Sequence, residues 1–140
     1  MSKQKEATIQ FVNFLVKESH IVFNEPGKHK VNIGIDPKGY IFKDLNQFHL
    51  QLEVDIKDEE NKFHIELATI SIFEYPEDAD LEAYKNGLFI LNAPSIVFPY
   101  LRSYISALTA LSGMPTLTLP TLNLGEVGSK LKENIEEVAE

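Results

Sequence analysis

The four histidines of this 140-residue chain are the side chains best suited to acid–base catalysis or metal binding near neutral pH. They stand at His20, His29, His49 and His64. No two of them have the i, i+4 spacing that a metal-binding helix requires, and no segment is rich in histidine. We therefore expect surface imidazoles, no catalytic residue and no metal site.

Other catalytic groups are equally scarce. Cysteine is absent, which removes thiol nucleophiles, disulfides and zinc sites built on thiolates. The pair Gly27-Lys28 lacks the upstream glycine and the following Ser or Thr of a phosphate-binding loop, and Gly128-Ser129-Lys130 has the wrong order. We expect a protein that is not an enzyme, does not hydrolyse ATP and holds no cofactor. A chain without cysteine also suits a reducing compartment, so cytoplasm is the expected location.

The overall charge is acidic. Thirteen basic and 21 acidic side chains give a formal net charge of −8, the wrong sign for sequence-independent binding to nucleic acid or to anionic lipid. The first residues lead into an alternating segment and not into a continuous apolar stretch, so no secretory signal is expected. We expect neither a nucleic-acid partner nor membrane insertion.

The charges are unevenly placed along the chain. The forty residues from Asn86 to Gly125 carry one charged side chain, Arg102. A transmembrane helix needs about 20 continuous apolar residues, and every such window here is interrupted by proline, at Pro94, Pro99, Pro115 or Pro120. A chain of this size has little interior for such a segment, so we expect it to be shared between subunits and partly exposed to a partner. An unusually apolar monomer core is the alternative.

The first three-fifths of the chain predicts antiparallel strands. Ile9–Phe23 is largely apolar, with a bend or bulge near Ser19, and Val31–Ile35 alternates apolar and small or polar residues. A hairpin follows, because the alternation of residues 48–57 resumes in residues 63–67 after a polar turn. Beyond residue 67 the apolar phase changes, which predicts a bulge near Ala68 and Thr69.

The register of this hairpin decides which charged residues meet. Pairing apolar with apolar side chains sets Ile56 opposite Phe63, and Asp55 then lies opposite His64. The same register sets Glu53 against Glu66, although like charges directly opposite destabilise a strand pair by up to about 1 kcal/mol. The outer face is therefore either a solvated surface or an acidic docking surface for a basic partner, formed by Glu53, Asp55 and Glu66.

Helical patterns come next. Asp80–Leu91 predicts a short helix weakened at Gly87, and Pro99–Ser112 predicts a longer one with Pro99 in its first turn. Its opposite side carries small, uncharged residues, so we expect this helix to be sandwiched; an ordinary core helix under one sheet is the alternative. The predicted oligomer interface consists of apolar residues at helical spacing: Val97, Leu101, Tyr104, Leu108 and Leu111. Because a buried unpaired ion is costly, Arg102 is expected to pair with a carboxylate or several carbonyls.

A single domain covers residues 1–140. We expect a flexible N-terminus over residues 1–8, strands over 9–75 and helices over 80–112. Residues 113–125 predict an extended apolar loop, because Pro120 cannot occupy a central strand. Residues 126–140 predict an acidic amphipathic helix whose apolar face is formed by Val127, Leu131, Ile135 and Val138.

One stretch of the chain is similar to a known family. Asn92-Ala-Pro-Ser-Ile-Val-Phe-Pro-Tyr-Leu-Arg102, then an uncharged helix and the segment Met114-Pro-Thr-Leu-Thr-Leu-Pro-Thr-Leu-Asn-Leu124, resembles the SecB family of export chaperones. The resemblance covers roughly Ile9 to Leu124, including four strands in the family order. It implies an α+β fold in which a four-stranded antiparallel sheet carries a long helix and shorter helices on one side. It also implies a dimer of dimers, with long helices between two eight-stranded sheets.

The same resemblance implies a function. A SecB-like protein is an ATP-independent holdase, which binds unfolded preproteins in an extended apolar groove and keeps them competent for translocation. Similarity places the groove between the sheet and the loop after the long helix, at Val31, Ile33, Ile35, Phe63, Leu122 and Leu124. The chain departs from the pattern because it has no Trp, and Leu124 stands where better known members have an aromatic residue. The alternatives are a SecB-like chaperone for another client, such as an antitoxin, a small-molecule or lipid carrier, and a purely structural oligomer.

A partner is implied as well. In export chaperones of the SecB family, acidic residues on the first and fourth strands dock the translocase ATPase SecA. Glu66 matches the fourth-strand acid, whereas His20 and Asn24 occupy the first-strand positions. SecA binding is therefore a hypothesis, and the sequence leaves open the client set and the choice between export and a toxin–antitoxin system.

Overall fold

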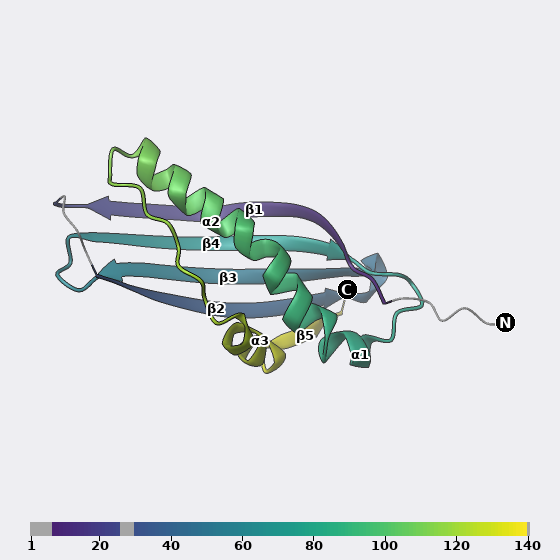
Figure 1. Cartoon of the computed structure of the whole chain (residues 1–140). Helices are drawn as coiled ribbons and strands as arrows, with labels where there is room; N and C mark the ends of the chain where they lie inside the picture. The colour runs from purple at the N-terminus through teal and green to yellow at the C-terminus, as the bar shows by residue number, and fades with distance from the viewer. Residues whose placement is uncertain (1–6, 26–29, 140) are drawn as a thin grey trace.

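The computed structural model describes residues 7–25 and 30–139. Most of the expected flexible N-terminus, and His29, lie outside these residues. The chain folds into the strands β1 (Gln10–Phe23), β2 (Val31–Phe42), β3 (Gln47–Asp58), β4 (Phe63–Glu74) and β5 (Ile135–Val138). Its helical elements are the 3-10 turn η1 (Lys43–Leu45), α1 (Leu81–Lys85), the π-helical turn η2 (Leu88–Asn92), α2 (Ala93–Leu111) and α3 (Leu124–Lys132). The α+β class and the helices on one face of the sheet agree with the expectation (Figure 1).

The sheet has five strands and not four. Its order is β1-β4-β3-β2-β5, in which β5 runs parallel to β2 and every other neighbouring pair is antiparallel. The predicted C-terminal helix over residues 126–140 is wrong beyond Lys132. Ile135 and Val138 belong to β5, where Ile135 pairs with Gly39. The amide of Gly39 donates to the carbonyl of Asn134 at 3.0 Å, which brings the chain onto the edge of β2.

An ion-pair network holds β5 in place. The carboxylate of Glu137 lies 2.8 Å from Lys85 Nζ on α1 and 3.0 Å from Lys43 Nζ on η1. The hydrogen bond from Lys85, followed by that from Lys43, lowers the pKa of the Glu137 carboxyl below its usual value. The same bond to Glu137 raises the pKa of Lys85. A carboxylate with a lowered folded-state pKa stabilises above its unfolded pKa and loses that contribution as the pH falls through the folded pKa.

Acidification is therefore expected to release β5 before the rest of the sheet unfolds. The amide signals of residues 135–138 should shift toward random-coil positions in a heteronuclear NMR titration as Glu137 becomes protonated. Glu137→Gln should produce the same change at neutral pH, while Glu136→Gln, on the opposite face of β5, should leave the signals in place. Signals of β5 that move only together with those of β3 and β4 would contradict this role.

The register of the β3–β4 hairpin differs from the prediction by two residues. Ile56 lies opposite Ile65, so that Asp55 faces Glu66 and Glu53 faces Ala68. A shift of two residues keeps every side chain on its predicted face. The predicted pairing implies a two-residue loop, whereas the strands are joined by the four residues 59–62, with Asn61 at a φ of 56°.

The predicted bulge in the fourth strand is also wrong. Pairing between β3 and β4 is continuous from Lys57–His64 to Gln47–Glu74. Thr69 and Ser71 remain on the buried face, with 2% and 0% of their surface exposed. The register shifts occur instead in β1, between Phe11 and Asn13 and between Val16 and Glu18, the second of them close to the bend expected near Ser19. An edge strand accommodates bulges more readily than a central one.

Helix α2 is longer than predicted and crosses the sheet obliquely (Figure 1). It begins at Ala93, so Pro94 occupies the first turn and Pro99 lies inside the helix, which corrects the expected start. Its buried side repeats every four residues, at Val97, Leu101, Ile105 and Thr109. The short helix expected over 80–91 is interrupted, because α1 ends at Lys85 and η2 begins after Gly87. The side chain of Asp80 accepts a hydrogen bond from Ala83 N at 3.3 Å and caps α1.

Helix α3 is locked against η2 by close backbone contact. A Cβ atom added at Gly128 would lie 2.4 Å from the carbonyl oxygen of Ile90. Gly128→Ala is therefore expected to lower the free energy of unfolding by about 1–3 kcal/mol, as overpacking of a rigid contact does. Thermal denaturation compares this variant with Gly34→Ala, whose added Cβ would meet no atom closer than 4.0 Å. Equal melting temperatures for the two variants would argue against the close contact.

Candidate binding surfaces

The predicted groove residues gather on the inner face of the sheet, on the side of the helices. Val31, Ile33 and Ile35 are half-buried and pack against the core at one edge of the sheet. Phe63 is only 5% exposed and belongs to the core itself. Leu122 and Leu124 are half-buried at the start of α3, where the segment over residues 113–123 ends.

Residues 113–123 form a crossing segment that runs over the inner face from α2 to α3 (Figure 1). Ser106 Oγ donates to the carbonyl of Leu117 at 3.1 Å, and the amide of Leu117 donates to Thr109 Oγ1 at 2.9 Å. Leu119 anchors the segment, because its side chain is 1% exposed. The expected extended apolar loop is thus held along α2, and most of its other side chains are exposed or half-buried.

The edge of β2 is only partly paired beside the groove residues, and α3 packs against β2 near residues 34–36 through Lys130. Strand β5 covers only residues 39–42 of β2. Over residues 31–38, no other strand of the described chain pairs with that edge. Backbone donors and acceptors therefore accompany the apolar side chains of Val31, Ile33 and Ile35. This combination suits an extended polypeptide, which binds through main-chain hydrogen bonds and apolar contacts together.

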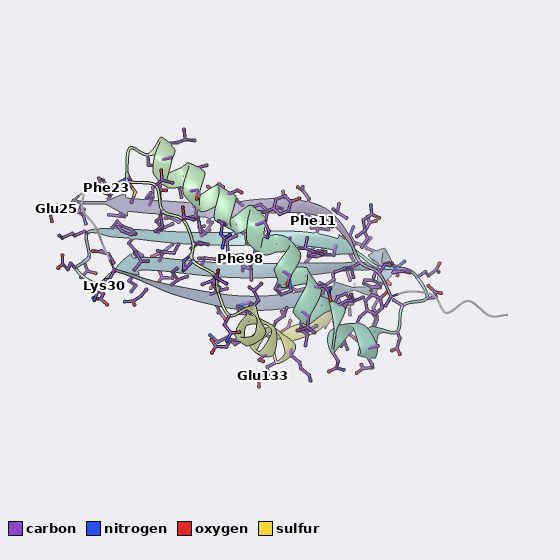
Figure 2. All side chains as sticks on the ribbon, viewed as in Figure 1. Phe11, Phe23, Glu25, Lys30, Phe98 and Glu133 are labelled. Carbon is purple, nitrogen blue, oxygen red and sulfur yellow. The ribbon has the colours of Figure 1, made fainter. Side chains whose placement is uncertain are left out.

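A second apolar surface, not predicted from the sequence, lies where β1 passes α2. The ring of Tyr100 is 4.8 Å from that of Phe11 and 5.9 Å from that of Phe14, and Phe11 is labelled beside α2 in Figure 2. An open depression of about 400 Å³ is lined there by Phe11, Val12, Asn13, Phe14, Ile96 and Tyr100. Val12 is 48% exposed on the same strand. Strand β1 is the other edge of the sheet, so this surface adjoins a second set of unpaired backbone groups.

The predicted oligomer interface is divided between core and surface. Val97 and Leu101 are fully buried against the chain's own sheet, and Tyr104 and Leu108 are half-buried. Leu111 is 88% exposed. The solvent side of α2 instead carries small, uncharged side chains at the exposed positions Pro99, Ser103, Ala107 and Ala110.

Arg102 lacks the predicted partner within residues 7–25 and 30–139. Its guanidinium lies 4.9 Å from the ring centre of Phe98, one turn earlier, and its Nε is buried without a hydrogen-bond acceptor. Figure 2 shows Phe98 on the side of α2 that faces the crossing segment. Arg102 and Ser106 follow it at four-residue intervals, so the guanidinium lies on that side too. A cation–π contact replaces the expected ion pair.

The outer face of the sheet, away from the helices, is acidic. A depression of about 570 Å³ opens there, and Glu53, Asp55 and Glu66 all line it; their role in docking stays a prediction. Glu18 and Asp36 add two more carboxylates, while Lys130 of α3 is the one lysine that the described residues contribute to its lining. His20, on β1, lies opposite Glu66, on β4. The surface has the charge needed to attract a basic partner.

His49 lies on the same outer face but at a distance from the acidic residues. Its Nε2 is 3.0 Å from Gln47 Oε1, and its ring centre is 4.3 Å from that of Phe42. Partial burial lowers the pKa of His49 below its usual value, so the ring is held in its neutral form. His49 is thus partly buried, whereas the sequence analysis expects a surface imidazole.

Comparison with known families identifies the fold. The family model described as "Preprotein translocase subunit SecB" matches residues 7–131, which include the four antiparallel strands, α2 and most of α3. The chain belongs to the SecB family. Membership supports a chaperone role, and SecB-family chaperones are not enzymes. Strand β5 lies beyond the residues matched to SecB.

Two relatives are similar to the chain, and one of them carries the SecB name. The chain is 26% identical over 149 aligned positions to "Uncharacterized protein MJ0357" of Methanocaldococcus jannaschii, covering 100% of this chain and 92% of that protein. It is 30% identical over 94 positions to "Protein-export protein SecB" of Anaplasma phagocytophilum, covering 64% of this chain and 60% of that protein. The second alignment thus spans less than two thirds of the Anaplasma protein's length.

A solved structure shares the SecB fold. The Mycobacterium tuberculosis Rv1957 SecB-like chaperone, in complex with a ChAD peptide from the Rv1956 HigA1 antitoxin, superposes with a TM-score of 0.66. The superposition covers 82% of this chain and 88% of that one at 16% sequence identity, which shows a common fold. Across the described ranges 7–25 and 30–139, no helix has the length and apolarity needed to span a membrane.

Proposed function

We propose that the protein is an ATP-independent holdase that binds unfolded polypeptides in an extended conformation on the inner face of its sheet. The observation that carries this proposal is the row of Val31, Ile33 and Ile35 beside the part of the β2 edge that no other described strand pairs. Burial of apolar surface supplies about 25 cal/mol per Å² without selecting a sequence. Main-chain hydrogen bonds to the strand edge are likewise independent of the client's side chains.

The proposed clients are preproteins kept competent for export. The export relatives of Anaplasma, and the family described as a preprotein translocase subunit, support this choice. The antitoxin peptide bound by the Mycobacterium chaperone supports the alternative, in which the client belongs to a toxin–antitoxin pair. Both clients would use the same groove, so the choice rests on client identification and not on the geometry of the site.

The proposed assembly is a homotetramer, a dimer of dimers. Two features support it: the open edge of β1 with its exposed Val12 and Leu15, and the small, uncharged solvent side of α2. Both would be buried if β1 edges paired and α2 helices packed between two sheets. Native mass spectrometry should then give a mass of about 64 kDa, four times the chain mass of 15.9 kDa.

A substitution on β2 tests the groove. Ile33→Asp places a charge on the inner face, and Asn32→Asp places the same charge one residue away on the outer face. The affinity for an unfolded, fluorescently labelled client should fall at least about tenfold for Ile33→Asp, and Asn32→Asp should bind like the unaltered chain. Leu122→Asp, on the crossing segment, repeats the test outside the sheet in case Ile33→Asp folds poorly. Circular dichroism establishes which variants are folded.

Measurements of client binding and of lipid binding separate the competing functions. A holdase slows the aggregation and refolding of a denatured client without ATP. In native mass spectrometry, it gains no mass after incubation with lipid extracts. Folded variants at positions 33 and 122 that keep full affinity would rule out this groove. Binding of lipid but of no unfolded chain would identify a carrier instead.

The acidic outer face is proposed as the docking surface for SecA. The clustering of Glu53, Asp55 and Glu66 in one depression supports it. Attraction between oppositely charged surfaces weakens as salt is added, so binding should decline from low to high ionic strength. Lack of SecA binding even at low ionic strength would end this part of the proposal and leave the holdase function standing.

A further inference from the structure

Three metal-ligating side chains meet on the outer face of the sheet. His64 Nε2 is in hydrogen-bond contact with Asp55 Oδ1, and His64 Nδ1 lies 3.4 Å from Glu66 Oε1. One ligand atom from each residue can be chosen so that all three lie within 4.8 Å of one another. His64 and Glu66 share a face because they are two residues apart on β4. Asp55 joins them across the β3–β4 pairing, opposite Glu66.

The chemistry of this set matches a transition-metal ion. Imidazole and carboxylate together are ligands of Zn²⁺, which binds nitrogen and oxygen donors at about 2.0–2.2 Å. Tetrahedral ligands at that range lie about 3.3–3.6 Å apart, so atoms at the full 4.8 Å span must close by about 1.2–1.5 Å. The side chains of Asp55 and Glu66 are 47% and 58% exposed and have room to rotate. His64, with 34% of its side chain exposed, is the more restricted member.

The surroundings favour a cation independently of the three ligands. The triad borders the 570 Å³ depression, whose lining includes Asp55 and Glu66 together with Glu18, Asp36 and Glu53. Two ammonium groups would stand near a bound cation: Lys130 belongs to the described lining, and Lys57 Nζ lies 3.9 Å from Asp55 Oδ2. His20 stands opposite Glu66 and is 66% exposed at the side chain, so a second imidazole faces the same space. The open side of the depression leaves room for water ligands.

We propose that Asp55, His64 and Glu66 form a binding site for one divalent transition-metal ion, of the zinc type. His64 and the two carboxylates supply three ligands, and water completes the coordination. The site lies on the face of the sheet opposite the proposed client groove, so binding of the ion and binding of a client are separate properties.

Calorimetric titration of the metal-free full chain with Zn²⁺ tests the proposal. One ion is expected per chain, and Co²⁺ should give the visible absorption bands of a site with nitrogen and oxygen ligands. His64→Asn and Glu66→Gln should each weaken zinc binding at least about tenfold. His49→Asn is the matched control, because it removes an imidazole from the same face of the sheet but outside the triad, and its affinity should match that of the unaltered chain.

The outcomes are separable from those of the holdase test. Zinc affinity unchanged in folded His64→Asn, or reduced equally in His49→Asn, would overturn the site. Absence of saturable binding at millimolar Zn²⁺ would overturn it as well. Client affinity is expected to be the same with and without the ion, so failure of the metal site leaves the groove untouched and failure of the groove leaves the site untouched.

Discussion

Phe89→Ala is expected to lower the free energy of unfolding by about 3–5 kcal/mol, the cost of emptying a large buried aromatic site. The ring of Phe89 is fully buried and stacks on Phe48 of β3, with ring centres 4.1 Å apart and planes 5° from parallel. Tyr84 of α1 meets Phe89 edge-on at 5.4 Å, and Tyr75 approaches to 5.8 Å. Phe89 thus joins η2, α1 and the sheet.

Chemical denaturation monitored by circular dichroism measures this loss. Leu91→Ala is the matched control, because Leu91 belongs to the same π-helical turn but is 56% exposed. Its loss should be below about 1 kcal/mol, as for an exposed substitution. A loss of similar size for both variants would mean that the turn itself, and not the aromatic contact, determines stability. The comparison matters for function because η2 leads directly into α2, which carries the crossing segment.

Alternation and helical spacing predicted most of the architecture. The period of two in residues 48–57 and 63–67 gave the hairpin and the correct faces, and the uncharged stretch from Asn86 to Gly125 gave the long helix and the crossing segment. Faces follow from local sequence, because side chains alternate along a strand whatever its partner is. The alternation along β2 likewise sets Val31, Ile33 and Ile35 on one face, and their place in a client groove stays a prediction from the resemblance.

The pairing of strands that are far apart in the sequence could not be predicted from the apolar pattern. Ile135 and Val138 are three residues apart, a spacing that suits one face of a helix, but they form β5 because Glu137 reaches Lys85 and Lys43 from two other elements. The triad of His64, Asp55 and Glu66 was not predicted either, because its members come from two strands. A search for helical metal motifs does not find ligands that meet across strands, although the predicted register already set Asp55 opposite His64.

One buried carboxylate closes the loop of the β3–β4 hairpin. Asp58 ends β3 and is 3% exposed. Its Oδ1 accepts hydrogen bonds from the amides of Lys62 and Phe63, the latter at 3.0 Å, and its Oδ2 accepts one from Glu60 at 3.3 Å. These bonds close the four-residue loop over residues 59–62. The sequence analysis assigned Asp58 to a polar turn and missed this role, although an aspartate at a turn position is the available signal.

Asp58→Ala is expected to cost about 2–4 kcal/mol, because three amides lose an ionised acceptor where the chain turns. Asp58→Asn should cost less, since its amide oxygen can still accept from Lys62 and Phe63. Glu59→Ala, at the next and exposed position, should change stability by less than about 0.5 kcal/mol. Denaturation in urea measures all three variants under the same conditions.

The same substitution tests what selects the register. Without the Asp58 carboxylate, the pairing of Ile56 with Phe63 through a two-residue loop becomes a closer competitor, because it keeps every apolar side chain on the inner face. That pairing separates Asp55 from Glu66 and sets Glu53 against Glu66, so it would change the acidic depression as well as the hairpin. Cross-strand nuclear Overhauser contacts distinguish the two registers. If Asp58→Ala keeps native stability and shows Ile56–Ile65 contacts without any Ile56–Phe63 contacts, the rest of the sheet fixes the register. In that case β1 and β2 hold β3 and β4 in place.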